Sequence, residues 1–151
     1  MLVYTGQKMQ FLDDVLGNHI DDLIEHKILE VLHRRVSPNE KRSFRNSMMY
    51  MSQVLHDPDI PSDAGIAIEF AIPQSAKRVD FIISGLDEER THQAVIVELK
   101  QWSEVSSVEH IEELIQVRAP QQDRHVVTTF QGGRHTTVHP SYQAYSYKTL
   151  I

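Results

Sequence analysis

Hydrophobic residues recur at helical spacing through the first third of the chain. From residue 7 to residue 36 they follow a period near 3.6, with an irregularity at Gly17 and Asn18. This pattern predicts one amphipathic helix or two helices in succession.

A helix-start signal follows directly. Ser37 is placed to cap a helix whose first residue is Pro38 and whose third residue is Glu40, an arrangement that satisfies the free N–H groups of a first turn. A further helix is therefore predicted from Pro38 to about Leu55. The first 62 residues are predicted to be mainly helical.

Three apolar segments in the middle of the chain have the pattern of β-strands. Residues 65–73 alternate large apolar side chains with small or polar ones, which indicates a half-buried strand. Residues 78–84 and 94–100 are rich in β-branched residues and are separated by a polar turn. Together these segments predict a three-strand antiparallel meander.

Charged residues interrupt these strands at related positions. If residues 73–76 form the first turn, the antiparallel register puts Glu69 directly opposite Asp80, and opposed side chains project from the same face. Glu98 and Lys100 share one face of the third predicted strand, because alternate side chains point the same way. Charged groups are rarely buried unless they are paired or bind a metal, so this set is a candidate site.

The last third of the chain combines helical and strand patterns. A Gly-Gly pair between two short apolar segments is typical of a small hairpin. The elements predicted here are a loop at residues 101–105, a helix at 106–117, hairpin strands at 126–130 and 134–138, and a final helix from residue 141 onward.

Composition narrows the class of protein. The chain has 151 residues, no cysteine and a formal net charge of −6. Its length suits one domain over residues 1–151, with a helical part at 1–62 and a sheet core at 63–151. The lack of a disulfide framework, a signal-peptide pattern and a long apolar run favours a soluble cytoplasmic protein with no membrane partner. The negative charge argues against indiscriminate nucleic-acid binding, but not against a nuclease, because a carboxylate metal site is itself acidic.

Basic residues gather near the junction of the predicted helices. They are candidates for contact with nucleic-acid phosphates, although a solvated helix end is the more ordinary interpretation of such a group. The residues are Arg34, Arg35, Lys41, Arg42 and Arg45.

The acidic set has the chemistry of a divalent-metal site. Asp80 and Glu98 would each supply a carboxylate to Mg²⁺ or Mn²⁺, the Leu99 carbonyl oxygen is a further ligand, and Glu69 is a tentative one. Lys100 would orient the attacking water or stabilise negative charge that develops on a phosphate. The competing interpretation is a surface ion pair between Glu98 and Lys100, worth about 0 to 1 kcal/mol.

Short segments of the chain resemble the PD-(D/E)XK nuclease superfamily. RVD and VIVELK place Asp80, Glu98 and Lys100 at its three signature positions, with valine where the motif has proline. YQAYSYK resembles the Q-x-x-x-Y element of the RecB-like branch and places Gln143 and Tyr147 on one helix face. Most of the chain from about residue 4 is similar to the amino-terminal domain of bacterial Schlafen-like nuclease-helicase proteins.

The resemblance implies an α/β (α+β) fold with a restriction-endonuclease-like αβββαβ core and additional N-terminal helices. It also implies Mg²⁺- or Mn²⁺-dependent hydrolysis of DNA or RNA, with Gln143 and Tyr147 in the catalytic set. Related proteins continue into an ATP-driven helicase domain. Because the chain has no G-x-x-x-x-G-K-[ST] loop and no evident last core strand, we expect it to be the N-terminal part of a longer protein.

Several alternatives stay open. Related enzymes often take an additional acid from the first helix, which nominates Glu25, whereas the register favours Glu69. The seven-residue recurrence of His19, His26 and His33 suggests zinc, but no cysteine or acid completes a compact set, so zinc is not expected. The chain is also compatible with a non-catalytic nucleic-acid-binding or docking module of a helicase, or with a fragment that folds with its missing portion or as a homodimer.

Overall fold

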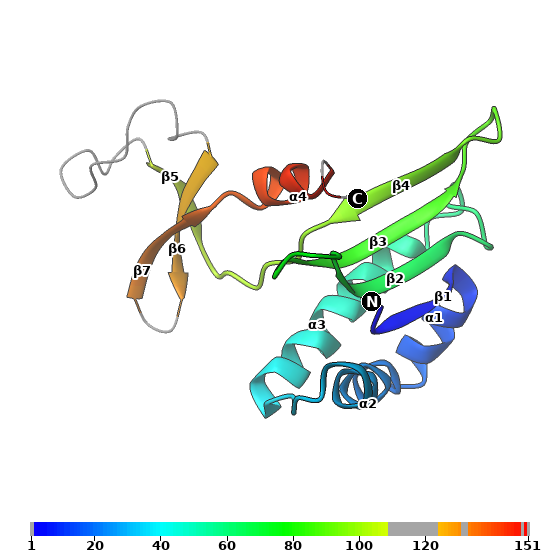
Figure 1. Ribbon diagram of the computed structural model, residues 1–151, viewed down its shortest axis with the longest axis horizontal. Helices are drawn as coiled ribbons and strands as arrows, with labels where there is room; N and C mark the ends of the chain where they lie inside the picture. The colour runs from blue at the N-terminus through cyan, green and yellow to red at the C-terminus, as the bar shows by residue number, and fades with distance from the viewer. Residues whose placement is uncertain (1, 109–123, 131–132, 149, 151) are drawn as a thin grey trace. The chain divides into compact units, whose positions relative to one another are not determined.

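The structure is a computed structural model that describes residues 2–108, 124–130, 133–148 and 150 (Figure 1). The chain divides into two compact units, Met1–Leu99 and Lys100–Ile151, and each is described by itself. The single domain expected from the chain length stays a prediction. Among the described residues, no helix is both long enough and apolar enough to span a membrane.

Residues 2–99 form a four-stranded antiparallel sheet and three helices. The sheet order is β1-β2-β3-β4, so the predicted meander is confirmed and gains a further strand at one edge. The elements in chain order are β1 (Tyr4–Gln7), α1 (Lys8–Leu16), α2 (Ile20–Leu32), α3 (Pro38–Leu55), β2 (Gly65–Ala71), β3 (Arg78–Leu86) and β4 (His92–Val97).

The helical part follows the sequence pattern closely. The predicted irregularity separates α1 from α2, and Asn18 adopts a left-handed conformation there, with φ of 55°. The Ser37 side chain accepts a hydrogen bond from the Glu40 N–H at 3.2 Å, which caps α3 as predicted. The first unit nevertheless begins with a strand that the sequence pattern did not predict, because Tyr4 and its neighbours pair with β2.

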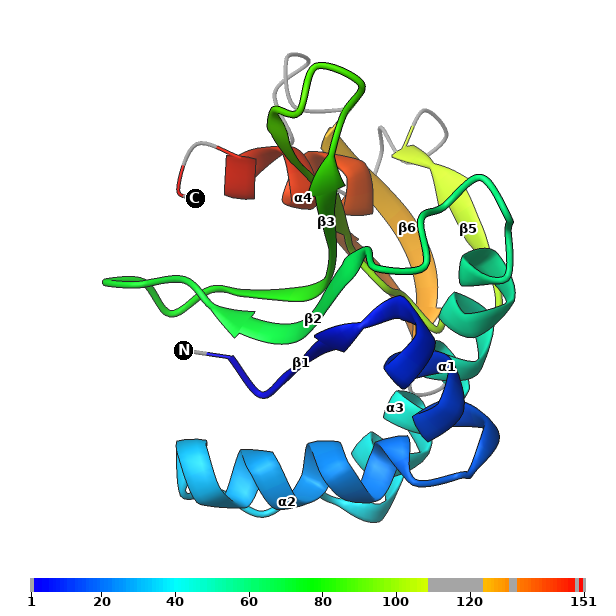
Figure 2. The same ribbon diagram turned by 90° about the vertical axis from the view of Figure 1, so that its right-hand side faces the viewer.

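The three helices lie on the same side of the sheet (Figures 1 and 2). Phe11 of α1 and Phe81 of β3 are fully buried and meet edge to face, with ring centroids 5.5 Å apart. Ile66 and Ile68 of β2 belong to the same core. Because side chains alternate along a strand, residues next to Ile68 and Phe81 project from the opposite face of the sheet. Asp80, which precedes Phe81 in β3, therefore lies on the face that α1, α2 and α3 do not cover.

The third strand of the meander ends earlier than predicted. β4 begins at His92 and stops at Val97, so Glu98, Leu99 and Lys100 lie beyond it, and the prediction of a strand reaching Lys100 is wrong. The physical reason is a hydrogen bond from the Leu99 N–H to Asp80 Oδ2, at 2.9 Å. The Asp80 side chain takes a backbone donor that would otherwise continue the ladder.

The second unit contains a three-stranded antiparallel sheet and a helix. The described elements are β5 (Val105–Ser107), β6 (His125–Phe130), β7 (Gly133–Val138) and α4 (Pro140–Lys148), with sheet order β5-β6-β7. The predicted hairpin and final helix are confirmed.

The helix predicted from residue 106 is wrong at its start, because Ser106 and Ser107 belong to β5 and pair with Val127 and Val126 of β6. Pairing with a strand distant in sequence overrides the local helical pattern here. Residues 109–117 of that predicted helix lie outside the described residues. With four described helices and two antiparallel sheets, the chain has a mixed α+β architecture, as expected at that level.

Candidate metal and nucleic-acid site

The predicted register between β2 and β3 is confirmed. Ile68 pairs with Phe81 and Phe70 pairs with Val79, so the position between them sets Glu69 opposite Asp80. The pair of Glu69 and Asp80 is itself missing from the ladder of paired residues between β2 and β3.

Glu69 explains the interruption, because its backbone is left-handed, with φ of 54°. A left-handed conformation costs a non-glycine residue about 1 to 2 kcal/mol. Strain of this kind concentrates at functional sites. The sheet is therefore distorted at the register position where Glu69 lies opposite Asp80.

Glu69 is held in an almost buried position. Its Oε2 accepts a hydrogen bond from Arg78 Nη1 at 2.9 Å, and its side chain is 13% exposed. Burial is the largest influence on this carboxyl and raises its pKa, the Arg78 guanidinium opposes the increase, and the charge of Asp80 adds to it. Glu69 and Asp80 are therefore electrostatically coupled.

Asp80 and Glu98 lie opposite each other where β3 runs beside the end of β4. Val97 pairs with Phe81, so the register places Glu98 across from Asp80 one step beyond the end of the ladder. One oxygen of Glu98, Oε2, is buried. We call Glu69, Asp80 and Glu98 the carboxylate row, because they occupy neighbouring register positions in β2, in β3 and directly after β4.

The carboxylate row has the right donor type for Mg²⁺ or Mn²⁺, which prefer oxygen ligands. Its side chains are not gathered into a finished metal site: among the described residues, no group of three or more His, Cys, Asp or Glu side chains is arranged to hold a metal ion. One oxygen of Asp80 is bonded to the Leu99 N–H and one oxygen of Glu69 to Arg78. The residues fit a hard divalent cation by their chemistry, and binding would need these carboxylates to turn.

The other predicted catalytic residues belong to the second unit. Lys100 is exposed and is the first residue of that unit. Gln143 Nε2 donates a hydrogen bond to the Tyr147 hydroxyl at 2.7 Å, and Tyr147 is 4% exposed, so the predicted shared helix face is confirmed. Their placement over the carboxylate row stays a prediction.

The predicted basic cluster is largely neutralised by acids. Arg35 and Arg42 are exposed and form no ion pair with other described residues. The remaining three pair across α2, α3 and the segment between them: Arg34 with Glu40, Lys41 with Asp22 and Glu25, and Arg45 with Asp21.

These pairs bear on the choice between two candidate acids. Glu25 ion-pairs with Lys41 between α2 and α3. Glu69 instead senses the charge of Asp80, which raises its pKa further. The register that sets Glu69 opposite Asp80 favours Glu69 over Glu25 as the third member of the acidic set.

Arg78 is the residue of this region that sequence reasoning missed. It is the first residue of β3 and stands two positions before Asp80, so both side chains belong to the same sheet face. The signal was present in the RVD segment, where a cation opens an otherwise apolar strand next to an acid.

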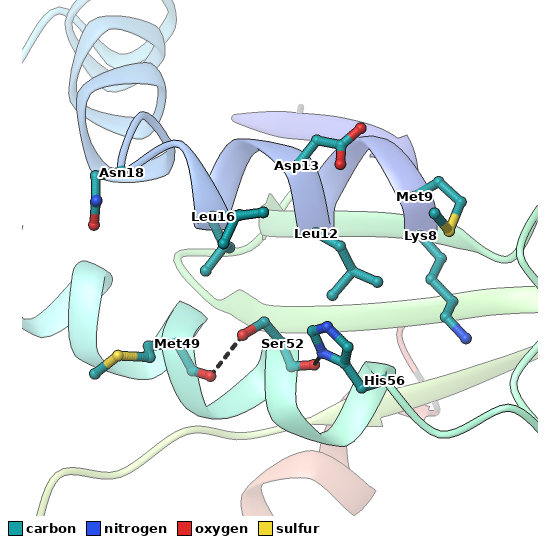
Figure 3. A pocket seen from close by; sticks show the side chains of 10 residues that line it. Lys8, Met9, Leu12, Asp13, Leu16, Asn18, Met49, Ser52 and His56 are labelled. Carbon is teal, nitrogen blue, oxygen red and sulfur yellow. Dashed lines mark hydrogen bonds between the residues drawn. The ribbon is translucent and has the colours of Figure 1, made fainter.

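A groove of about 560 Å³ lies elsewhere, between α1 and α3 (Figure 3). Leu12 and Leu16 of α1 point toward Met49 and Ser52 of α3 in this view. Lys8 donates instead to the carbonyl oxygens of Asp57 and Ile60, at 2.9 and 2.6 Å. The groove is on the helical side of the sheet and is distinct from the carboxylate row.

Comparison with known protein families, curated proteins and solved structures found no match to this chain.

Proposed function

We propose that the chain is a Mg²⁺- or Mn²⁺-dependent nuclease domain that hydrolyses phosphodiester bonds in DNA or RNA. The observation that carries the proposal is the carboxylate row: Glu69 faces Asp80 through a strained backbone, and Glu98 follows at the next register position. In a longer protein, this domain would act together with an ATP-driven helicase motor.

The order of elements supports the nuclease proposal. The succession α3-β2-β3-β4, with an antiparallel β2-β3-β4 meander, would serve as the αβββ start of the proposed restriction-endonuclease-like core. The acidic residues fall on the middle strand of that meander and at the end of its third strand. This is the arrangement that the superfamily resemblance implies.

The proposed roles follow from chemistry. Asp80, Glu98, the Leu99 carbonyl and Glu69 would hold the ion, which when bound lowers the pKa of a coordinated water and neutralises phosphate charge. Lys100 would donate hydrogen bonds to the attacking water or to the phosphate. Such a donor is worth most where negative charge develops.

Gln143 and Tyr147 would position the nucleic-acid strand from α4. Their mutual hydrogen bond fixes the amide and the phenol relative to each other. Such preorganised donors contribute to catalysis by orientation.

Cleavage of labelled single- and double-stranded DNA and RNA with Mg²⁺ or Mn²⁺ tests the proposal. Asp80→Asn, Glu98→Ala and Lys100→Ala should each abolish cleavage. Glu30→Gln is the matched control, because Glu30 is an exposed helix acid paired with Lys27. Cleavage that survives Glu98→Ala and Lys100→Ala would refute the assignment.

A second candidate function is a nucleic-acid-binding or docking module without catalysis. It is favoured by the bonds that the acids already make: Asp80 accepts from the Leu99 N–H and Glu69 accepts from Arg78. Nucleic-acid binding without divalent-metal binding or cleavage would select this module over the nuclease.

A further inference from the structure

The groove between α1 and α3 is lined mainly by apolar side chains, and several of them are exposed. Leu16 is 83% exposed and Met49 is 48% exposed, while Leu12 and Val15 are partly buried against the core. The volume of about 560 Å³ lies within the range of about 300 to 1,000 Å³ that small-molecule sites occupy. The groove therefore has the size and the lining of a ligand site.

Lys8 brings a positive charge into this apolar lining. The residue is only 6% exposed, and among the described residues no carboxylate pairs with its ammonium group. Two of its three N–H donors are used by the carbonyl oxygens of Asp57 and Ile60, at 2.9 and 2.6 Å. A buried charge is costly unless an opposite charge compensates it. Within the described part of the chain, the groove thus contains a buried cation with one remaining donor and no counter-ion.

The start of α1 adds to the positive potential at this end of the groove. Lys8 is the first residue of α1, whose first turn has no side-chain cap and no acid. The N-terminal end of a helix carries a partial positive charge. Asp13 is the one acid among the described lining residues, and it is exposed and points away from the side that Leu12 faces (Figure 3). The end of the groove at Lys8 therefore favours an anion.

The ordinary interpretation of Lys8 is a structural clamp that ties the start of α1 to the segment after α3. This clamp explains the hydrogen bonds to Asp57 and Ile60, which a neutral amide could also donate. It does not explain a full charge without a counter-ion, because two carbonyl dipoles offset only part of that charge. It also does not explain why Leu16 and Met49 are exposed along the same groove. A ligand with an apolar chain and an anionic head would account for both features.

The two ends of the groove differ in polarity. Lys8 and His56 lie toward one end in Figure 3, and Leu16 and Met49 lie toward the other. The hydrogen bond from Lys8 to the Asp57 carbonyl agrees with this arrangement, because Asp57 directly follows His56. From Lys8 to Leu16 the helix rises by about 12 Å, a length that a medium-chain alkyl group spans.

We propose that this groove binds a medium-chain fatty acid. The carboxylate pairs with the ammonium group of Lys8, and the alkyl chain lies along Leu12, Leu16 and Met49. The site is separate from the carboxylate row, so the proposal does not depend on nuclease activity.

Isothermal titration calorimetry of the full chain with octanoate, decanoate and decanol tests the proposal, with each probe below the concentration at which it forms micelles. Each fully buried methylene group strengthens binding by about fourfold. Decanoate should therefore bind more tightly than octanoate, by up to about fifteenfold for two methylene groups. Decanol should bind more weakly than decanoate, because it lacks the charge that Lys8 compensates.

Lys8→Met tests the role of the charge, because methionine keeps an unbranched apolar side chain. The variant should weaken decanoate binding by about tenfold or more, since hydrogen bonds to charged groups are among the stronger ones. Decanol binding should stay unchanged. The ratio of the two affinities is the readout, because loss of the clamp to Asp57 and Ile60 would affect both ligands equally. Circular dichroism confirms folding.

Met49→Asp tests the apolar part of the groove without touching the clamp. It places a polar and negative group beside the alkyl chain, so it should abolish decanoate binding. Val54→Asp is the matched control, because Val54 is an exposed residue of the same helix, 54% exposed, and lies outside the groove lining. The control should bind decanoate as the unmodified protein does.

Several results would overturn the fatty-acid site. They are absence of decanoate binding, equal affinity for octanoate and decanoate, equal weakening of decanoate and decanol by Lys8→Met, and binding that Met49→Asp leaves unchanged. Sedimentation velocity separates a further occupant, a second copy of this chain. A dimer that Met49→Asp dissociates and that decanoate does not affect would assign the groove to self-association and reject the fatty acid.

Discussion

The left-handed backbone of Glu69 gives a stability test in which glycine and alanine change places. At most strand positions, replacing alanine by glycine destabilises the fold. At Glu69, with φ of 54°, glycine should be the better residue. Comparing Glu69→Gly with Glu69→Ala removes the Arg78 ion pair from both variants, so the difference isolates the backbone.

The magnitude follows from two opposing terms. A left-handed conformation costs alanine about 1 to 2 kcal/mol that glycine avoids. Glycine loses about 0.4 to 1 kcal/mol through the greater freedom of its unfolded chain. We therefore expect Glu69→Gly to be more stable than Glu69→Ala by about 1 kcal/mol.

The control is Ala67, which lies two residues earlier in β2 on the same sheet face and has no positive φ. Ala67→Gly should destabilise by about 0.5 to 1 kcal/mol, the opposite sign. Urea unfolding followed by far-ultraviolet circular dichroism gives both values. If the glycine variant is less stable than the alanine variant at position 69 as well, the backbone of Glu69 is not strained, and the inference of a distorted sheet at the carboxylate row is wrong.

Four further predictions concern the same unit. Burial raises the pKa of Glu69 above its ordinary 4.5, so its contribution to the free energy of unfolding is complete below pH 4.5 and is lost as the pH rises through the raised pKa. The urea midpoint of Glu69→Gln should lack this decrease with rising pH. The hydrogen bond from Arg34 lowers the pKa of Glu40, so this contribution is present above pH 4.5 and is lost as the pH falls, and Glu40→Gln should blunt acid unfolding. Ser37→Ala should cost about 1 kcal/mol through loss of the α3 cap, whereas Ser37→Asp should be nearly neutral in the same unfolding assay. Phe81→Ala should cost about 3 to 5 kcal/mol, because the ring is fully buried against Phe11, while the exposed Val54→Ala should change stability by less than about 0.5 kcal/mol.

Local signals in the sequence predicted much of the first unit. Ser37, Pro38 and Glu40 define the start of α3 because capping depends on residues within one turn. The alternation in β2, and the short turn between β2 and β3, fixed the register that brings Glu69 opposite Asp80. Both features depend on neighbours in sequence.

Features that depend on distant partners were missed. β1 is short, and it forms because β2 offers it a free edge rather than because of its own pattern. β4 ends at Val97 because the Asp80 side chain binds the Leu99 N–H. Neither contact leaves a periodic signal in the sequence.

The candidate site shows the same division. Its acids were predicted from residue type and register. The backbone strain at Glu69 and its hydrogen bond from Arg78 were not predicted. A positive φ at a glutamate within a strand has no signature in the sequence. Side-chain bonds between elements emerge only when the elements are packed.

Divalent-metal binding by the carboxylate row separates a metal-dependent nuclease from a module without catalysis. Isothermal titration calorimetry with Mn²⁺ should show binding to the unmodified protein and to Glu30→Gln. Asp80→Asn and Glu98→Gln should lose it while keeping the circular dichroism spectrum. Absence of Mn²⁺ binding in the unmodified protein, or binding that Asp80→Asn leaves unchanged, would refute the proposed metal site.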